Sequence, residues 1–245
     1  MANQENGRVS RSRTLMLTQF SILLAIQAVF CFTFLGSVPM PTGVVATLAH
    51  LPAIVTGMLL GVKAGALMGF FFGLFSFFVW TFMPGSPFMA FMFTPFWTVP
   101  GELAPIVGEG CETLCPVADR VCKCVGNPRY HEYMGNFGSL LICFVPRILV
   151  GTFAALAVKF VPNKLSINYF IGAIIGSVTN TLLVVGGMFL FFADRIEPIW
   201  GSAATVFLGG IVMGNGIPEA IIAAVVCPAI CIPIGRFLNK QKMMN

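Results

Sequence analysis

The sequence predicts an all-α membrane protein with six transmembrane helices, cytoplasmic termini and a long extracellular loop between the third and fourth helices. Three observations carry this prediction. Hydrophobic residues make up 57% of the 245 residues and charged residues only 9%, whereas soluble domains carry about 25% charged residues. The apolar residues form runs near the ~20 residues that a helix needs to cross a bilayer. Lysine and arginine concentrate in alternate connections, as the positive-inside rule describes.

The apolar runs predict a single membrane domain over residues 1–245. Helices 1–3 fall within residues 14–83, the extracellular loop occupies residues 84–136, and helices 4–6 fall within residues 137–238. The six expected spans are about Leu15–Gly36, Val44–Leu60, Ala64–Phe82, Phe137–Val161, Tyr169–Phe192 and Ile217–Leu238.

The distribution of charge orients these spans. With both ends inside, the inner segments hold most of the basic residues, and the outer loops hold most of the acids. The inner basic residues are Arg8, Arg11, Arg13, Lys63, Lys159, Lys164, Arg236, Lys240 and Lys242. Both termini, including the polar tail Met1–Arg13, are therefore expected in the cytoplasm. The net charge of +5 reflects this topology, and we expect the bilayer rather than nucleic acid as the partner of the chain.

Glycines predict a close helix contact. Gly65, Gly69 and Gly73 recur every fourth residue, so they share one face of the third span. Small residues on one face let the backbone of a neighbouring helix approach.

The final apolar stretch predicts a broken helix. Ser202–Leu238 is too long for one helix perpendicular to the bilayer, and Gly214–Glu219 interrupts it. Pro218 suits the first turn of a new helix. We expect a helix N-terminus there, whose free N–H groups and positive dipole favour an anionic group. Asp194–Gly201, ahead of this stretch, is expected to be a polar loop.

Arg147 is the most informative residue, because it lies inside an apolar run that continues to Val161. A charge at that depth costs roughly 2.5–3.5 kcal/mol on insertion scales, so it normally faces a partner or a water-filled cavity. Two compatible interpretations follow. Arg147 binds an anionic group of a ligand, or it pairs with Glu219, the acid inside another apolar span.

Other polar or aromatic residues accompany Arg147 in the spans. The candidate ligand-binding residues are Arg147, Asn180, Asn215, Glu219, His50, Thr47 and Trp80. A structural role is the alternative for several of them: a bond between helices for His50 and Asn180, a helix cap for Asn215, and an interfacial anchor for Trp80. Together they predict a site for a small polar, acidic metabolite, open to the outer face. We expect no metal and no cofactor in it.

The long loop has two parts. Phe88–Trp97 is aromatic and rich in methionine, and is a candidate to fold back over the mouth of a pocket. The second part holds four cysteines whose spacing fits no standard zinc motif: Cys111, Cys115, Cys122 and Cys124. Disulfides are expected if the loop is extracellular. A metal site near His131 and free thiols are the alternatives.

Several function classes lack their sequence signatures. The chain contains no G-x-x-x-x-G-K-[ST], no H-E-x-x-H and no G-x-S-x-G motif, so it has no P-loop for ATP and no common hydrolase signature. It also shows no inverted repeat typical of a secondary transporter. Three classes remain: a binding subunit served by separate ATPases, an intramembrane enzyme with Glu219 and His50 as acid and base, and a stand-alone transporter or channel.

The motifs of this chain resemble the substrate-binding S components of energy-coupling factor (ECF) vitamin transporters, most strongly the branch assigned to pantothenate. The resemblance covers nearly all of Leu15–Leu238 outside the long loop. The segments that carry it are Thr47-Leu-Ala-His-Leu-Pro52, Gly61–Ser76, Phe144-Val-Pro-Arg-Ile-Leu-Val-Gly151, Thr179-Asn-Thr181 and Asn215-Gly-Ile-Pro-Glu219.

The resemblance implies a subunit that captures a vitamin outside the cell and docks on a membrane-embedded coupling subunit with two cytoplasmic ATPases. Docking in this family often uses two small residues four apart in the first helix, for which Ser21 and Ala25 are the nearest match. For pantothenate, Arg147 would bind the carboxylate, Asn180 an amide or hydroxyl, and Trp80 would cover the gem-dimethyl group. Riboflavin, folate or another small metabolite are the alternative substrates.

Overall fold

The computed structural model describes residues 2–33, 36–39, 45–84, 87–96, 135–162, 166–200 and 204–244, and helices dominate these segments. The long helices are α1 (Ala2–Phe32), α3 (Val62–Phe82), α6 (Phe137–Phe160), α7 (Ile167–Trp200) and α9 (Ile217–Met244). The shorter elements are β1 (Ser37–Pro39), β2 (Val45–Thr47), α2 (Leu51–Leu60), α4 (Pro87–Ala90), α8 (Ala204–Ile211) and the π-helix η3 (Val212–Gly216).

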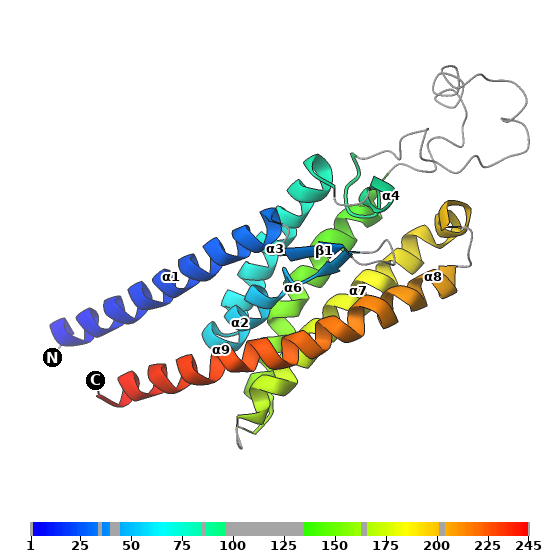
Figure 1. The fold of residues 1–245 in the computed structure, drawn as a ribbon. Coiled ribbons are helices and arrows are strands. Elements are labelled where there is room, and N and C mark those ends of the chain that lie inside the picture. The colour runs from blue at the N-terminus through cyan, green and yellow to red at the C-terminus, as the bar shows by residue number, and fades with distance from the viewer. Residues whose placement is uncertain are drawn as a thin grey trace, which may run out of the picture.

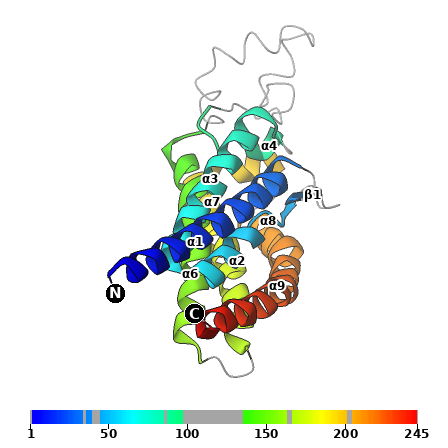
Figure 2. The same ribbon diagram turned by 90° about the vertical axis from the view of Figure 1, so that its left-hand side faces the viewer.

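The helices form one elongated bundle (Figure 1). Within it, α6 contacts both α3 and α7, and α7 also contacts α9. The bundle therefore has α6 at its centre. In contrast, α1 lies across the outside of the bundle against α2 and α3 (Figure 2), and only 11% of its apolar span is buried.

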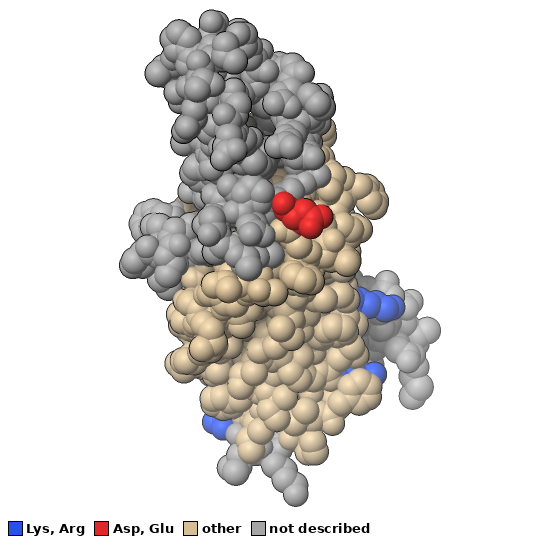
Figure 3. Space-filling view, turned by 90° about the vertical axis from the view of Figure 1, so that its right-hand side faces the viewer, with Lys and Arg blue, Asp and Glu red and all other residues tan. Residues whose placement is uncertain are grey.

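The surface of the bundle suits a bilayer. The face in Figure 3 is mostly uncharged, with an acidic group toward one end and basic groups farther toward the other. The start of α1 and the end of α9 lie at the same end of the molecule (Figure 1). Among the described residues, five helical segments are long and apolar enough to cross a membrane. The chain is a multi-pass membrane protein, and which side its termini face remains a prediction.

The second predicted span, Val44–Leu60, is wrong in its first half. The structure has a β-hairpin in which Val38 pairs with Ala46, and the helix begins only at Leu51. Proline in the first turn starts a helix, and Pro52 occupies that place here. At ~1.5 Å per residue, the 10 residues of α2 extend about 15 Å, half of the ~30 Å hydrocarbon core. Apart from this hairpin of two three-residue strands, the described part of the fold is helical, as predicted.

The predicted break at Gly214–Glu219 is also wrong in form. The apolar span is continuous over Thr205–Phe237, and the π-helix η3 joins α8 to α9. The N–H of Ile217 donates to the carbonyl of Val212, five residues back. A π turn accommodates an extra residue without ending the helix. No separate helix with a free N-terminus starts at Pro218.

Other boundaries differ less. The expected spans over Ala64–Phe82 and Phe137–Val161 agree with α3 and α6 to within about two residues, as helix ends usually allow. The polar tail Met1–Arg13 is helical from Ala2, because α1 extends back beyond the membrane span. Asp194–Trp200, expected as a loop, continues α7.

The core consists of two apolar clusters of buried side chains. One joins α2, α3, α6 and α9 around Ile54, Phe72 and Val150. The other joins the segment after α4 to α7 and α8 around Phe91 and Phe192. A cavity lined by residues of both clusters lies between them.

Candidate ligand-binding site

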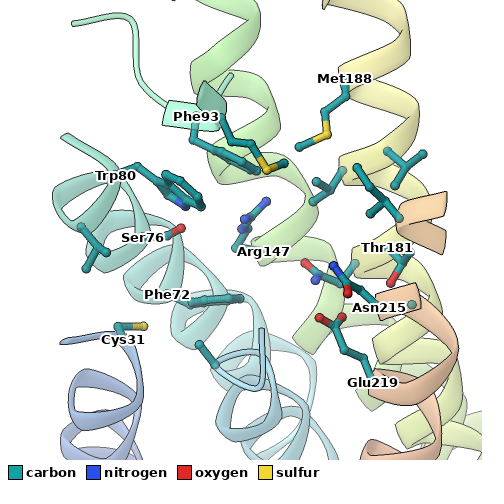
Figure 4. Close-up of a pocket in the computed structure, with 18 residues that line it drawn as sticks. Cys31, Phe72, Ser76, Trp80, Phe93, Arg147, Thr181, Met188, Asn215 and Glu219 are labelled. Atoms are coloured by element: carbon teal, nitrogen blue, oxygen red, sulfur yellow. The ribbon is translucent and has the colours of Figure 1, made fainter. Parts of the chain in front are cut away.

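The cavity is lined by α3, α6, α7, η3 and the segment Met89–Phe93, with the end of α1 at its edge (Figure 4). Its volume is about 110 Å³. One water needs only about 10–15 Å³ on the same measure. The cavity is therefore large enough for a small organic molecule.

Arg147 of α6 points into this cavity (Figure 4) and is only 4% exposed. Its Nη1 donates a hydrogen bond of 2.8 Å to the carbonyl oxygen of Ile142 in the same helix. Its Nε is buried and has no hydrogen-bond partner. The guanidinium therefore keeps an unused donor inside the membrane span.

The guanidinium makes cation–π contacts with two aromatic rings. The Cζ atom of Arg147 lies 5.6 Å from the ring centroid of Phe72 and 5.2 Å from that of Phe93. A cation within about 6 Å of a ring centroid is attracted to it, by about 2 kcal/mol or more where water is excluded. These contacts offset part of the burial cost and restrict the motion of the side chain.

A polar wall faces Arg147 from the other side of the cavity. It consists of Asn180 from α7, Asn215 from η3 and Glu219 from α9, all buried. The Oδ1 atoms of Asn180 and Asn215 have no hydrogen-bond partner. Glu219 interacts electrostatically with Arg147. The two amide oxygens are therefore acceptors in the cavity wall that no other group of the described residues uses.

Part of the stretch Phe88–Trp97, which was expected to fold back over the mouth of a pocket, lies at the cavity wall. We call this part, from Met89 of α4 to Phe93 just after it, the covering segment. Met89 and Phe93 line the cavity, and the indole of Trp80 stacks on Phe93 with ring centroids 4.7 Å apart. The hydroxyl of Ser139 in α6 donates to the carbonyl of Phe91 at 2.7 Å. These contacts tie the covering segment to α3 and α6.

The glycines of α3 place Arg147, and their predicted packing role is confirmed. A Cβ on Gly69 would lie 2.1 Å from the carbonyl oxygen of Arg147. A Cβ on Gly65 would lie 2.5 Å from that of Gly151. The backbones of α3 and α6 are therefore in direct contact, as small residues permit in membrane helices.

Five of the predicted binding residues line one cavity: Trp80, Arg147, Asn180, Asn215 and Glu219. His50 is fully buried as the N-cap of α2, but it is not among the lining residues. The side chain of Thr47 lies outside the described residues, as do the four loop cysteines. The docking candidates Ser21 and Ala25 are exposed on α1.

Several lining residues were not predicted from the sequence. Phe72, Phe93, Ser76, Thr181 and Cys31 all contribute to the wall. Phe72 lies in an apolar run, so no local signal separated it from ordinary core. Phe93 lies in the stretch Phe88–Trp97, which was expected over a pocket mouth, but nothing singled out this residue. Thr181 follows Asn180 in the segment Thr179-Asn-Thr181, so it is a polar residue inside an apolar span and could have been singled out from the sequence.

Comparison with known proteins identifies the relatives of this chain. No family model matches it. Over 226 residues it is 30% identical to the pantothenic acid transporter PanT of Lactococcus lactis subsp. cremoris. The match covers 92% of this chain and 95% of PanT, so it extends over the membrane helices and all cavity elements. The chain belongs to the family of S components of ECF vitamin transporters, in the branch that contains this pantothenic acid transporter.

Proposed function

We propose that the chain is the high-affinity substrate-capture subunit of an ATP-driven ECF-type importer, with pantothenate as its substrate. One observation carries this proposal: a buried guanidinium with an unused Nε faces two amide oxygens without partners. The name of the Lactococcus relative supports the choice of pantothenate.

The chemistry of pantothenate fits the two sides of the cavity. The molecule has a carboxylate at one end and an amide, two hydroxyls and a gem-dimethyl group along its length. We assign Arg147 to the carboxylate, because a guanidinium binds carboxylate as a planar two-donor fork. The oxygens of Asn180 and Asn215 accept from the amide N–H or a hydroxyl. Trp80 is assigned to the gem-dimethyl group, and apolar residues of α7, among them Val184 and Met188, also line the cavity.

Glu219 has a second role in this assignment. It lies in the same wall as Asn215 and is 5% exposed. Its carboxylate accepts a ligand hydroxyl or orients Arg147, and both uses keep its charge compensated inside the membrane. The internal interaction with Arg147 and ligand binding by Arg147 are thus compatible.

The energy source is proposed to lie on separate subunits. The sequence has no P-loop, so we assign ATP hydrolysis to two cytoplasmic ATPases that act through a membrane-embedded coupling subunit. The exposed Ser21 and Ala25 on α1 are the proposed docking residues. We also propose that both termini lie on the cytoplasmic side.

The substrate is tested first by mass spectrometry of the ligand released when the protein, purified from its native membrane, is denatured. Stoichiometric pantothenate is expected. Finding a flavin, a folate or another vitamin would show that pantothenate is not the substrate. Finding a neutral ligand would show that Arg147 has a structural role instead of binding a carboxylate.

The role of Arg147 is tested by calorimetric titration of Arg147→Gln with pantothenate. Removing one partner of a buried charge pair costs about 2–5 kcal/mol, so affinity should fall at least ~30-fold. Arg236→Gln is the control, because Arg236 is exposed near the end of α9. A folded Arg147→Gln protein that keeps full affinity for pantothenate would refute the assignment of Arg147 to the carboxylate.

Docking is tested by copurification with the ATPases. A double variant, Ser21→Phe with Ala25→Phe, should bind pantothenate normally but no longer copurify with them. Retention of the ATPases by this variant would exclude these two residues as the docking contact.

A further inference from the structure

Pro146 precedes Arg147 inside α6 and changes the hydrogen bonding of that helix. Proline has no N–H, so the carbonyl four residues earlier loses its helical partner. Here that carbonyl belongs to Ile142, whose side chain is 2% exposed. Because the membrane interior offers no water to replace the bond, this oxygen needs another donor.

Arg147 supplies that donor. Its Nη1 lies 2.8 Å from the Ile142 oxygen. In a regular helix the N–H of residue 146 would bond to this oxygen. The proline therefore leaves the acceptor to the neighbouring side chain.

We propose that Pro146 is a positioning residue that determines which edge of the Arg147 guanidinium faces the ligand. With Nη1 bonded to the helix, the edge formed by Nε and Nη2 remains for a carboxylate. The Nε atom on this edge has no hydrogen-bond partner. The rings of Phe72 and Phe93 hold the group between them. This inference rests on the proposed function, because it takes the carboxylate of the ligand as the group that is bound.

The arrangement favours planar anions over neutral groups. Two parallel N–H donors fixed on one edge match the two oxygens of a carboxylate, whereas a hydroxymethyl group uses at most one of them well. Without the bond to Ile142, the guanidinium must be ordered when the ligand binds. Ordering one long side chain reduces affinity by about three- to tenfold.

The experiment compares pantothenate with pantothenol, in which a hydroxymethyl group replaces the carboxylate. Titrations use the wild type, Pro146→Ala, Arg147→Gln and the double variant that combines them. Alanine is the best helix former and restores the N–H, so Pro146→Ala should remain folded. Pro228→Ala is the matched control, because Pro228 also lies inside a membrane helix but does not line the cavity.

We expect Pro146→Ala to weaken pantothenate binding about three- to tenfold and to leave pantothenol binding unchanged. In the Arg147→Gln background, Pro146→Ala should have no further effect, because its action passes through Arg147. Equal losses for both ligands, no loss, or the same loss in Pro228→Ala would overturn the inference while the proposed function stands. A wild type that binds neither ligand would overturn both.

Discussion

Replacing Gly69 with alanine tests whether the contact between α3 and α6 sets the position of Arg147. The new Cβ would lie 2.1 Å from the carbonyl oxygen of Arg147 and 2.7 Å from Cα of Ile148. Real Cβ atoms do not come within 3.0 Å of such atoms, so the shorter contact must lengthen by about 0.9 Å. Both neighbours are backbone, so the two helices themselves must separate.

Two energies compete in this variant. Overpacking costs typically about 1–3 kcal/mol, and alanine in a helix gains about 0.5–1 kcal/mol over glycine. The net result is a destabilisation of up to about 2.5 kcal/mol. A binding site tolerates roughly 0.5 Å of misplacement, and a shift near 1 Å costs up to about 100-fold in a positioned site. We expect pantothenate affinity to fall roughly 10- to 100-fold.

The assay pairs thermal unfolding in detergent with calorimetric titration of pantothenate. Gly186→Ala is the matched control, since a Cβ on this glycine of α7 meets nothing within 4 Å. It should keep its affinity and gain slightly in stability. If Gly69→Ala behaves like Gly186→Ala in both measurements, the helix contact does not position Arg147.

Three further variants test the covering segment and the attachment of α1. Ser139→Ala leaves the carbonyl of Phe91 without its 2.7 Å bond, which should lower stability by about 1–3 kcal/mol in thermal unfolding. Trp80→Ala removes the ring stacked 4.7 Å from Phe93, a pair worth about 0.5–1.5 kcal/mol, so stopped-flow dissociation of pantothenate should be several-fold faster. Gln27→Leu removes the 2.6 Å bond to the carbonyl of Ala49, and the unfolding midpoint should drop for the same reason as in Ser139→Ala.

Matched controls separate these effects from general damage. Thr152→Val removes a hydroxyl that bonds only within α6, to Ile148, and should have a smaller effect on stability than Ser139→Ala. Phe82→Ala removes an aromatic ring of α3 that is 72% exposed and should leave dissociation unchanged. If a variant and its control show the same stability or the same dissociation rate, the contact removed in that variant does not contribute to that property.

The polar half of the site could be predicted because polar residues are expensive in a membrane span. Arg147, Asn180, Asn215 and Glu219 each stood out against an apolar background, and the structure brings them to one cavity. His50 stood out equally but does not line that cavity. The sequence signal reports burial of a polar group and does not report which cavity the group faces.

The apolar half could not be predicted in the same way. Phe72 lies in an apolar run and Phe93 lies in an aromatic, Met-rich stretch beside Thr94. Only tertiary packing decides which of the many rings in these stretches meet the guanidinium. The predicted ends of two helices were wrong for a different reason. The Gly-Asn-Gly-Ile-Pro sequence at Gly214–Pro218 is compatible with both a helix break and a π turn, whereas Pro52 was an available start signal for α2 that the apolar run obscured.

The Phe72–Arg147–Phe93 arrangement has a consequence for the stability of the empty protein. Arg147 loses its hydration when the protein folds, before any ligand binds. Its contacts with two rings and one carbonyl offset only part of this desolvation free energy. Replacing both charged residues with apolar residues of similar size, as in Arg147→Met with Glu219→Met, should give a more stable protein that no longer retains the vitamin, because neither buried charge is then left without its partner. The wild type should in turn gain thermal stability with ligand concentration, because only the folded form binds. The ligand-free protein is therefore less stable than a variant with an apolar site would be, and this lower stability is the cost of binding the vitamin.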